Sequence, residues 1–337
     1  MTAANVCIEL SVRKPRPTKA KPAYRRVLGF PVLPDNPFGL DASPEVIECE
    51  SFVASDAPPT TQFTPVWQDS EHGVWLYRGN SLSIMDRIAE RYPDGVFDMI
   101  FADPPYFLSN GGITCHAGRM VSVNKGEWDK SRGPEENHNF NREWLARCQR
   151  LLKPNGTIWV TGTMHVIFSV GYAMQQLGYR ILNDVIWWKT NPAPHLACRY
   201  LQHATETALW ARKSEEAKHV FHYAEMKRLS GGKQMQNVWR FASVPRQEKA
   251  LGGHPTQKPV ALVKRMIECC TNPNDLVLDP FMGSGTTGVA CVQTERRFVG
   301  IDVNEAYCRT AERRVEAALQ ASRQESVFAI PARQVGS

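Results

Sequence analysis

The sequence contains no run of about 20 apolar residues, the length that a membrane-spanning helix needs. Its first ten residues are too short and too mixed in character for a secretory signal. None of its 9 cysteines belongs to a Cys-x-x-Cys pair or has histidines at ligand spacing, so we expect reduced, mostly buried thiols and no metal. These absences argue against a membrane protein, a disulfide scaffold and a zinc protein, and they predict a cytoplasmic location.

The chain also has no acidic excess. It carries 40 Lys and Arg against 34 Asp and Glu, a formal net charge of +6 and a pI near 8.8. This value lies just below the pI of about 9 that is typical of nucleic-acid-binding domains, so overall charge favours a polyanionic partner without establishing one. The basic residues are concentrated in two places: residues 13–26 contain no acid, and residues 191–253 contain twice as many bases as acids.

The pattern of apolar residues divides the chain into a body and an arm. Residues 1–65 are rich in proline, which interrupts helical and strand periods, so we predict an extended basic arm. From Val74, short apolar runs alternate with amphipathic stretches. We predict strands at 96–102, 157–161, 181–188, 276–278 and 298–301, and helices at 143–152, 166–177, 260–270, 286–293 and 304–321. This alternation predicts a doubly wound α/β fold with a mostly parallel sheet, interrupted by a less regular basic insert.

A glycine-rich segment follows the predicted strand 276–278. It reads Asp-Pro-Phe-Met-Gly-Ser-Gly-Thr-Thr-Gly from Asp279 to Gly288 and satisfies the nucleotide-binding pattern G-x-G-x-x-G. Asp302, after the next predicted strand, stands where an acid binds ribose hydroxyls. An NAD(P)-dependent oxidoreductase uses the same pattern, so the glycines alone leave that alternative open. The carboxylate of Asp279 would repel a pyrophosphate but suits a ligand with an ammonium and a sulfonium, which favours S-adenosylmethionine.

A second motif, Asp103-Pro104-Pro105-Tyr106, follows the predicted strand 96–102, at the sheet edge where such folds hold ligands. Its two prolines fix φ and remove N–H donors, which leaves a carboxylate, bare carbonyls and an aromatic ring in a stiff frame. An exocyclic amine of a base is a weak nucleophile because its lone pair is delocalised into the ring. If the Asp103 carboxylate and the Pro104 carbonyl each accept one N–H, the lone pair can face a methyl donor, and Tyr106 can stack on a flipped-out base. The motif therefore predicts methylation of an amino group.

The order of these motifs resembles that of the β-group DNA amino-methyltransferases, in which the catalytic motif precedes the cofactor motif. Between the two lie the basic insert and the segment His-Pro-Thr-Gln-Lys-Pro at residues 254–259. Residues 101–113, 189–194 and 204–213 are similar to those of DpnA-type adenine methylases, and the resemblance covers about residues 74–318. It implies a Rossmann-like methyltransferase fold with a catalytic half (66–190), a target-recognition insert (191–253) and a cofactor-binding half (254–321). The arm (1–65), which has no counterpart in the family, precedes this fold, and a tail (322–337) follows it.

The resemblance also implies roles for individual residues. Catalysis falls to Asp103, Pro104, Pro105 and Tyr106. Cofactor contacts fall to Asn80, Thr256, Lys258, Asp279, Pro280, Phe281, Gly283, Ser284, Gly285, Thr286 and Asp302. The chain departs from the family at Asn80, where an acid after glycine usually accepts from the cofactor's adenine amino group. An amide oxygen accepts without charge, so we expect a weaker or altered contact there.

The insert at residues 191–253 stands in the place of the family's target-recognition region. Its basic side chains can neutralise phosphates, and its polar side chains can read base edges. We expect DNA contacts from Asn191, His195, Arg199, Lys233 and Arg240. Residues 125–129 follow the catalytic loop, and we interpret them as a segment that closes over the target.

The sequence as a whole predicts site-specific methyl transfer from S-adenosylmethionine to the N6 amino group of a flipped-out adenine in duplex DNA. Methylation of cytosine N4 stays open because the same amine activation serves it, whereas cytosine C5 chemistry needs a cysteine after proline and the chain has no Pro-Cys pair. A non-catalytic DNA-binding regulator is a further alternative, against which the intact catalytic cluster argues. We also expect a homodimer, with a cognate restriction endonuclease as a candidate partner.

Overall fold

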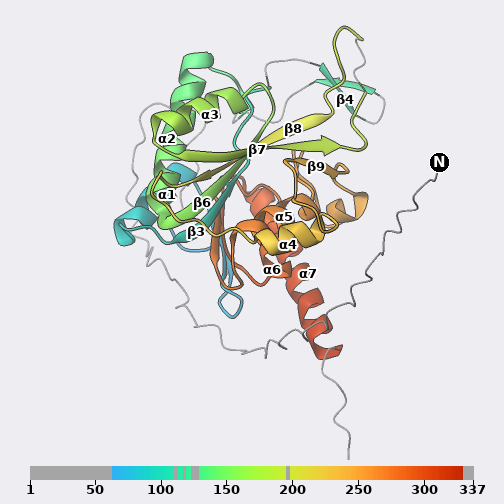
Figure 1. Ribbon diagram of the computed structural model, residues 1–337. Helices are drawn as coiled ribbons and strands as arrows, with labels where there is room; N and C mark the ends of the chain where they lie inside the picture. Colours follow the sequence, from blue (N-terminus) through green and yellow to red (C-terminus); the bar gives the residue numbers. More distant parts are fainter. Residues whose placement is uncertain (1–62, 110–112, 117–118, 123–128, 195–197, 329–337) are drawn as a thin grey trace, which may run out of the picture.

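The computed structural model describes residues 63–109, 113–116, 119–122, 129–194 and 198–328 (Figure 1). Most of the predicted arm and tail, His195, and residues 125–128 of the segment expected to close over the target lie outside these ranges. Within the described ranges, no helix combines the length and the apolar character that a bilayer crossing requires.

The body is built on one nine-stranded sheet with the order β1-β2-β11-β10-β3-β6-β8-β7-β9 (Figure 1). Strands β2, β11, β10, β3 and β6 run parallel, whereas β1 and β8 run antiparallel to their neighbours. A separate hairpin joins β4 (Ile113–His116) to β5 (Arg119–Ser122). The strands of the large sheet are β1 (Trp67–Asp69), β2 (Val74–Arg78), β3 (Phe97–Ala102), β6 (Leu152–Gly162), β7 (Arg180–Lys189), β8 (Thr205–Arg212), β9 (Val238–Phe241), β10 (Leu276–Asp279) and β11 (Arg297–Asp302).

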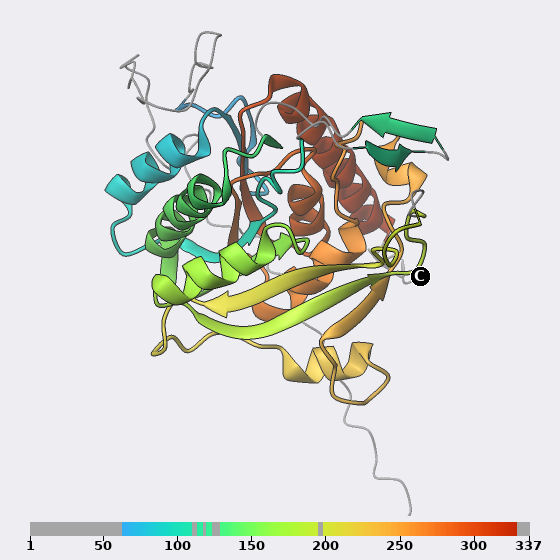
Figure 2. The same cartoon turned by 90° about the horizontal axis from the view of Figure 1, so that it is seen from above.

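Helices cover both faces of this sheet (Figures 1 and 2). One face carries α1 (Ser81–Arg91), α2 (Pro134–Leu151) and α3 (Ile167–Gln176); the other carries α5 (Val260–Cys270), α6 (Thr286–Gln293) and α7 (Glu305–Phe328), with α4 (Tyr223–Leu229) beside α5 and a short 3-10 helix at Arg246–Lys249. In β10, Leu276 and Leu278 pack with the first layer and Val277 with the second. Because the central strands are buried on both sides, they read as unbroken apolar runs, and the predicted doubly wound fold is confirmed.

Two predicted elements begin several residues earlier than expected, and the last helix, expected to end at about residue 321, extends to Phe328. The helix expected at 143–152 begins instead at Pro134, where a proline in the first turn and the acids Glu135 and Glu136 mark a helix start that its weakly apolar sequence concealed. The strand expected at 157–161 begins at Leu152, which pairs with Phe97 before the register shifts and residues 153–156 bulge out of the ladder.

The insert at 191–253 is less separate than the sequence suggests. Strand β8 lies within it, yet it pairs with both β6 and β7 in the central sheet. Its side chains Ala208 and Trp210 are buried in the core, where the Trp210 ring stacks on Trp159 of β6. The described residues that we expect to contact DNA, Asn191, Arg199, Lys233 and Arg240, lie on either side of β8.

Candidate active site

The candidate site lies where the parallel strands β3, β10 and β11 end. Strand β10 pairs with β3 on one side and β11 on the other, so the glycine-rich loop after β10 stands between Asp103, which follows β3, and Asp302, the last residue of β11. The two motifs are far apart in the sequence, but the sheet brings them to one edge. This is the edge at which open α/β sheets bind ligands.

Asp103 is held by three side chains from different elements. Its Oδ1 accepts hydrogen bonds from the Tyr106 hydroxyl at 2.7 Å and from Thr161 Oγ1, near the end of β6, at 2.6 Å. Its Oδ2 accepts from Lys258 Nζ at 2.5 Å, and the Lys258 side chain is 5% exposed. Burial alone would lower the pKa of Lys258, but Asp103 and Glu206 together raise it, so the ammonium stays charged at neutral pH. The sequence assigned Lys258 to the cofactor; the structure brings it to the Asp103 carboxylate.

A second ion pair stands beside the first. Lys189 Nζ, at the end of β7, lies 2.5 Å from Glu206 Oε1 on β8. Glu206 Oε2 lies 3.4 Å from the Tyr106 hydroxyl and 3.6 Å from Lys258 Nζ. Burial raises the pKa of Tyr106 well above its ordinary value, and the nearby carboxylates of Asp103 and Glu206 raise it further, so the phenol stays a hydrogen-bond donor. Sequence reasoning did not assign Glu206 a role, because only the sheet brings it near Asp103.

Residues 103–109 follow β3, and we call them the catalytic loop because the sequence predicts catalysis there. Asp129 holds this loop in place by hydrogen bonds. Its two carboxylate oxygens accept from the backbone N–H groups of Tyr106, Phe107 and Leu108 at 2.9, 2.8 and 3.2 Å, and from Ser109 Oγ at 2.9 Å. Phe107 adopts φ 58°, a left-handed conformation that a non-glycine residue holds only when its surroundings enforce it. Asp129 was expected to move over the target; fully buried, it is instead a fixed anchor of the loop. Pro104 and Pro105 are buried as well.

The glycine-rich loop depends on glycine at two positions. Gly283 has φ 50° and its N–H donates to Asp302 Oδ2 at 2.9 Å. Gly285 has φ 76°, and a Cβ there would lie 2.7 Å from the Cβ of Ala311 on α7. The loop therefore closes tightly onto α7 and onto the carboxylate that ends β11.

Asp279 shapes this loop from inside. Its Oδ1 accepts from the Phe281 N–H at 3.0 Å and its Oδ2 from Thr287 Oγ1 at 2.5 Å, and the side chain is buried. Burial raises the pKa of Asp279 to about 7. Its neighbour Pro280 is buried. The ring of Phe281 packs edge-on against Trp144 of α2, with 5.5 Å between the ring centroids. The structure thus gives Asp279 a role in loop geometry, and its contact with a ligand ammonium stays a prediction.

Ser284 and Thr286 were expected to touch the cofactor, but their hydroxyls point to a buried arginine. Arg314 Nη1 on α7 donates to Ser284 O at 2.6 Å, to Ser284 Oγ at 2.9 Å and to Thr286 Oγ1 at 3.1 Å. The Ser284 hydroxyl also donates to Gln257 Oε1 at 3.2 Å. Arg314 was not predicted as a site residue; its one signal in the sequence is a basic residue beside Val315 on the apolar face of α7.

Asp302 completes the cofactor side of the site. Its Oδ1 accepts from the Asn304 N–H at 2.7 Å, and its Oδ2 accepts from Gly283. Burial raises the pKa of Asp302 to about 6. Near Gly283 of the glycine-rich loop, Thr256 Oγ1 lies 3.0 Å from Nδ1 of His254, whose ring packs edge-on against Tyr307.

Asn80 serves as the N-cap of α1. Its Oδ1 accepts from the N–H groups of Leu82 at 2.9 Å and Ser83 at 3.4 Å, and the preceding Gly79 N–H donates to the carbonyl of Asp302 at 3.0 Å. The residue therefore lies beside the ribose-binding candidate, but its side-chain oxygen is occupied by the helix terminus. Its contact with a cofactor adenine stays a prediction.

The dual position of Asn80 gives a paired test. Asn80→Ala is expected to lower the unfolding free energy by about 1 kcal/mol because a cap is lost. Asn80→Asp keeps the cap and adds a charge that helix N-termini favour, so stability should be retained and cofactor affinity should rise by about fivefold, the difference between a charged and a neutral acceptor. Thermal unfolding and calorimetric titration measure both. Equal cofactor affinity in wild type and Asn80→Asp would remove Asn80 from the adenine site.

Two cavities flank the catalytic loop. The larger, of about 720 Å³, extends from Lys189 and Glu206 to α3, and its volume is in the range of small-molecule sites. Its wall includes Leu108, Thr163, His165, Phe168, Tyr172 and Thr205. The smaller, of about 380 Å³, lies against Tyr106 and Phe107 and reaches the first turns of α2 and α3. Both cavities reach Leu108, so open space lies next to the catalytic loop.

The residues expected to contact DNA are exposed where the structure describes them. Asn191, Arg199, Lys233 and Arg240 all lie at the surface. Asn191 Oδ1 also accepts from the Ser243 N–H at 2.7 Å, which ties the two segments beside β8 together. Arg240 lies on the edge strand β9, and its guanidinium is 4.7 Å from the ring centroid of Trp188 on the neighbouring strand β7. Their contacts with DNA stay predictions.

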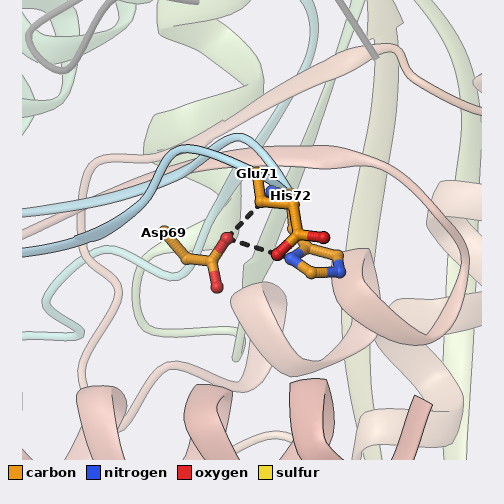
Figure 3. Close-up of side chains that lie close together, drawn as sticks. All are labelled: Asp69, Glu71 and His72. Carbon is orange, nitrogen blue, oxygen red and sulfur yellow. Dashed lines mark hydrogen bonds and ion pairs between the residues drawn. The ribbon is translucent and has the colours of Figure 1, made fainter. Parts of the chain in front are cut away.

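Asp69, Glu71 and His72 gather in the turn between β1 and β2 (Figure 3). His72 Nδ1 and the His72 backbone N–H each lie 2.9 Å from Asp69 Oδ1. Arg323 of α7 lies 3.4 Å from the Asp69 carboxylate and 3.0 Å from that of Glu71. The turn precedes β2 and so lies at the sheet edge opposite the candidate site. We interpret the cluster as a hydrogen-bonded turn docked on α7 and assign it no metal.

Residues 97–313 match the family of N6/N4 DNA methylases. The chain is 54% identical to the Type II methyltransferase M2.DpnII of Streptococcus pneumoniae, over 65% of this chain and 82% of that protein. It is 48% identical to the Type II methyltransferase M2.LlaDCHI of Lactococcus lactis subsp. cremoris, over 75% of this chain and 92% of that protein. Among solved structures, it is similar to M1.HpyAVI in complex with S-adenosylmethionine, at 31% identity and a TM-score of 0.56, over 72% of this chain and 98% of that one.

Proposed function

Because the chain belongs to the N6/N4 DNA methylase family and is a DNA methyltransferase that uses S-adenosylmethionine, we propose that its target is the N6 amino group of adenine at a specific site in duplex DNA. Family membership removes the oxidoreductase alternative that the glycines left open. The observation that carries the proposal is the Asp103 carboxylate, which stands at the end of β3 one strand away from the glycine-rich loop.

The residues after β10 and β11 fit the cofactor. The Asp302 carboxylate can accept from ribose hydroxyls, and the left-handed backbone at Gly283 and Gly285 lets the loop close onto Asp302 and α7 and so shapes the site beside that carboxylate. When bound, S-adenosylmethionine supplies a methyl group on a sulfonium, an electrophile that needs no further activation. The protein's remaining task is to hold the amine in the correct orientation.

Asp103 and Pro104 hold that amine. A carboxylate offers about four lone-pair positions, so Asp103 can accept an amine N–H while Tyr106 and Thr161 keep it in place. The Pro104 carbonyl accepts the second N–H, and the negative Asp103 stabilises the positive charge that develops on the nitrogen as the new bond forms. The fixed hydroxyl of Tyr106 sets the position of its ring, on which we infer that the base stacks.

Adenine is favoured over cytosine by the residue that opens the catalytic motif. A serine in place of Asp103 would have favoured cytosine N4; this chain has aspartate. The experiment is to incubate purified protein with unmethylated plasmid DNA and S-adenosylmethionine and to identify the modified nucleoside by mass spectrometry. The proposal expects N6-methyladenine, and N4-methylcytosine as the product would refute it.

DNA recognition falls to the two segments that flank β8, at residues 190–204 and 213–253. Their exposed Arg199, Lys233 and Arg240 support contacts with phosphates or base edges, and the tie between Asn191 and Ser243 supports their acting as one surface. We place the protein in the cytoplasm, where DNA and cofactor meet. The Type II methyltransferases among its relatives support a cognate restriction endonuclease as partner.

We propose that two copies form a homodimer through α3. Met164, Phe168 and Tyr172 form an exposed apolar stripe at and along this helix, and Phe168 is 76% exposed. Such stripes mark protein interfaces more often than solvated surface. Size-exclusion chromatography at several concentrations should show a dimer for the wild type and a monomer for Phe168→Asp. A wild-type monomer at all concentrations would refute the proposal.

Cofactor affinity should depend on pH through Asp302. Burial raises its pKa to about 6, and a ribose that donates to the carboxylate favours the ionised form. Affinity should therefore rise as pH increases through about 6 and level off above about 7. Titrations between pH 5 and 8 should show this rise in the wild type, whereas Asp302→Asn should bind more weakly and lack the step near pH 6, keeping only a change near pH 7 from Asp279. The same slope in both proteins would assign the pH dependence to another group.

A further inference from the structure

Four charged side chains of alternating sign cross the candidate site in a row, in the order Lys189, Glu206, Lys258 and Asp103. Their exposed fractions are 21%, 12%, 5% and 14%, so all four are largely removed from water. The two end pairs are in close contact at 2.5 Å, and Glu206 Oε2 and Lys258 Nζ in the middle are 3.6 Å apart. The row of four has no net charge. Glu206 lies between the two lysines, and Lys258 lies between the two carboxylates.

Lys258 therefore stands between two carboxylates and pairs closely with only one. That partner is Asp103, the carboxylate that must accept an N–H from the target amine. Tyr106 and Thr161 hold Oδ1, so the amine must be accepted by Oδ2, the oxygen that now accepts from Lys258. Displacing the Lys258 ammonium from Oδ2 inside a nearly dry site is costly unless a second anion is at hand. Glu206 is that anion, and a shift of about 1 Å would bring the ammonium into full contact with it.

Glu206 also reaches a second of the three groups that hold Asp103. Its Oε2 lies 3.4 Å from the Tyr106 hydroxyl, which donates to Asp103 at 2.7 Å. Glu206 and Lys189 moreover line the 720 Å³ cavity beside the catalytic loop, so the carboxylate stands at the boundary between Asp103's partners and the space open to a substrate. An ion pair with only a structural role on the sheet would contact neither the partners of Asp103 nor the cavity.

We infer that Glu206 is a positioning residue that takes over the ion pair of Lys258 when the target amine engages Asp103, and that Lys189 holds Glu206 in place for this exchange. The inference rests on the proposed function of Asp103 in orienting an amine. No bond is made or broken in the exchange; one ammonium moves between two carboxylates. Asp103 is thereby held by Lys258 while the site is empty and released to the substrate without leaving Lys258 unpaired.

The test separates the rate of transfer from binding. Glu206→Gln keeps the size and the hydrogen-bonding shape of the side chain but removes its charge. We expect its single-turnover methyl-transfer rate to fall by about 10- to 100-fold, the effect of misplacing a reacting group. Affinity for S-adenosylmethionine, and flipping of the target base followed with 2-aminopurine in the target position, should stay within about twofold of the wild type. Lys189→Met should show the same split, and Lys189→Arg should restore most of the rate.

Glu90→Gln is the matched control, because Glu90 forms an exposed ion pair with Arg87 at the far end of α1. It should behave as the wild type. A wild-type transfer rate in Glu206→Gln would overturn the inference, as would a rate loss matched by equal losses in cofactor affinity and melting temperature. Product analysis of the wild-type reaction tests the adenine target separately, because methylated cytosine would refute it. The ratio of the transfer rates of Glu206→Gln and the wild type decides the role of Glu206, whichever base is methylated.

Discussion

Replacing Asp103 with asparagine is expected to lower the single-turnover methyl-transfer rate by about 10³-fold, while affinity for S-adenosylmethionine stays within about twofold. The substitution preserves the size of the side chain but removes the charge that stabilises the developing ammonium. It also turns one of the two oxygens that now accept from Tyr106, Thr161 and Lys258 into an N–H donor. Rapid-quench measurement of methyl transfer to a short duplex, alongside calorimetric titration of the cofactor, gives both values.

Asp98→Asn is the control for this substitution. Asp98 lies on the same strand β3 and also pairs with a lysine, Lys153 at 2.8 Å, but at the opposite edge of the sheet. Its variant should transfer methyl groups at the wild-type rate. If Asp103→Asn kept more than about a tenth of the wild-type rate, a carboxylate at this position would not be needed for amine activation.

Replacing Gly285 with alanine is expected to destabilise the protein by about 2–4 kcal/mol and to weaken cofactor binding by about tenfold or more. Gly285 combines a φ of 76° with a packing conflict, because an added Cβ would lie 2.7 Å from Ala311 Cβ and 2.9 Å from Ala311 Cα. The second of these atoms belongs to the backbone of α7, so it cannot rotate away. The glycine-rich loop must shift, and Gly283 would move from Asp302 with it.

Gly178→Ala separates the two causes. Gly178 has a similar φ of 79°, but an added Cβ there would meet nothing within 4 Å. Its variant should lose only about 1 kcal/mol, the cost of the backbone conformation, and should bind the cofactor normally. Chemical denaturation and cofactor titration of both variants measure the difference. Equal losses of stability would show that the contact with α7 is unimportant.

The sequence predicted those parts of the fold that depend on local pattern. Strands β3, β10 and β11 are buried on both faces, so each appears as a short apolar run. An acid marks the carboxyl end of each strand: Asp103 directly after β3, Asp279 as the last residue of β10 and Asp302 as the last residue of β11. The order of motifs along the chain was sufficient to predict which acids meet at one edge. The place of β8 between β6 and β7 was not predictable in this way, because strand order within a sheet leaves no periodic signal in the strand itself.

Contacts between side chains of distant elements could not be predicted from the sequence. Ser284 and Thr286 match a cofactor motif, yet their hydroxyls bind Arg314, which lies on another element. Asn80 shows the reverse case: an asparagine directly before an amphipathic helix is a cap signal that the sequence did contain. Lys258 matched a motif for the cofactor side and reaches Asp103 only because the sheet brings the two loops together.

The most direct test of the central claim is long-read sequencing of modified bases in the genome of a methylation-free host that expresses this chain. The account predicts N6-methyladenine at one short sequence motif with the wild type and none with Asp103→Asn at equal protein level. N4-methylcytosine, or N6-methyladenine that persists in the Asp103→Asn strain, would contradict it.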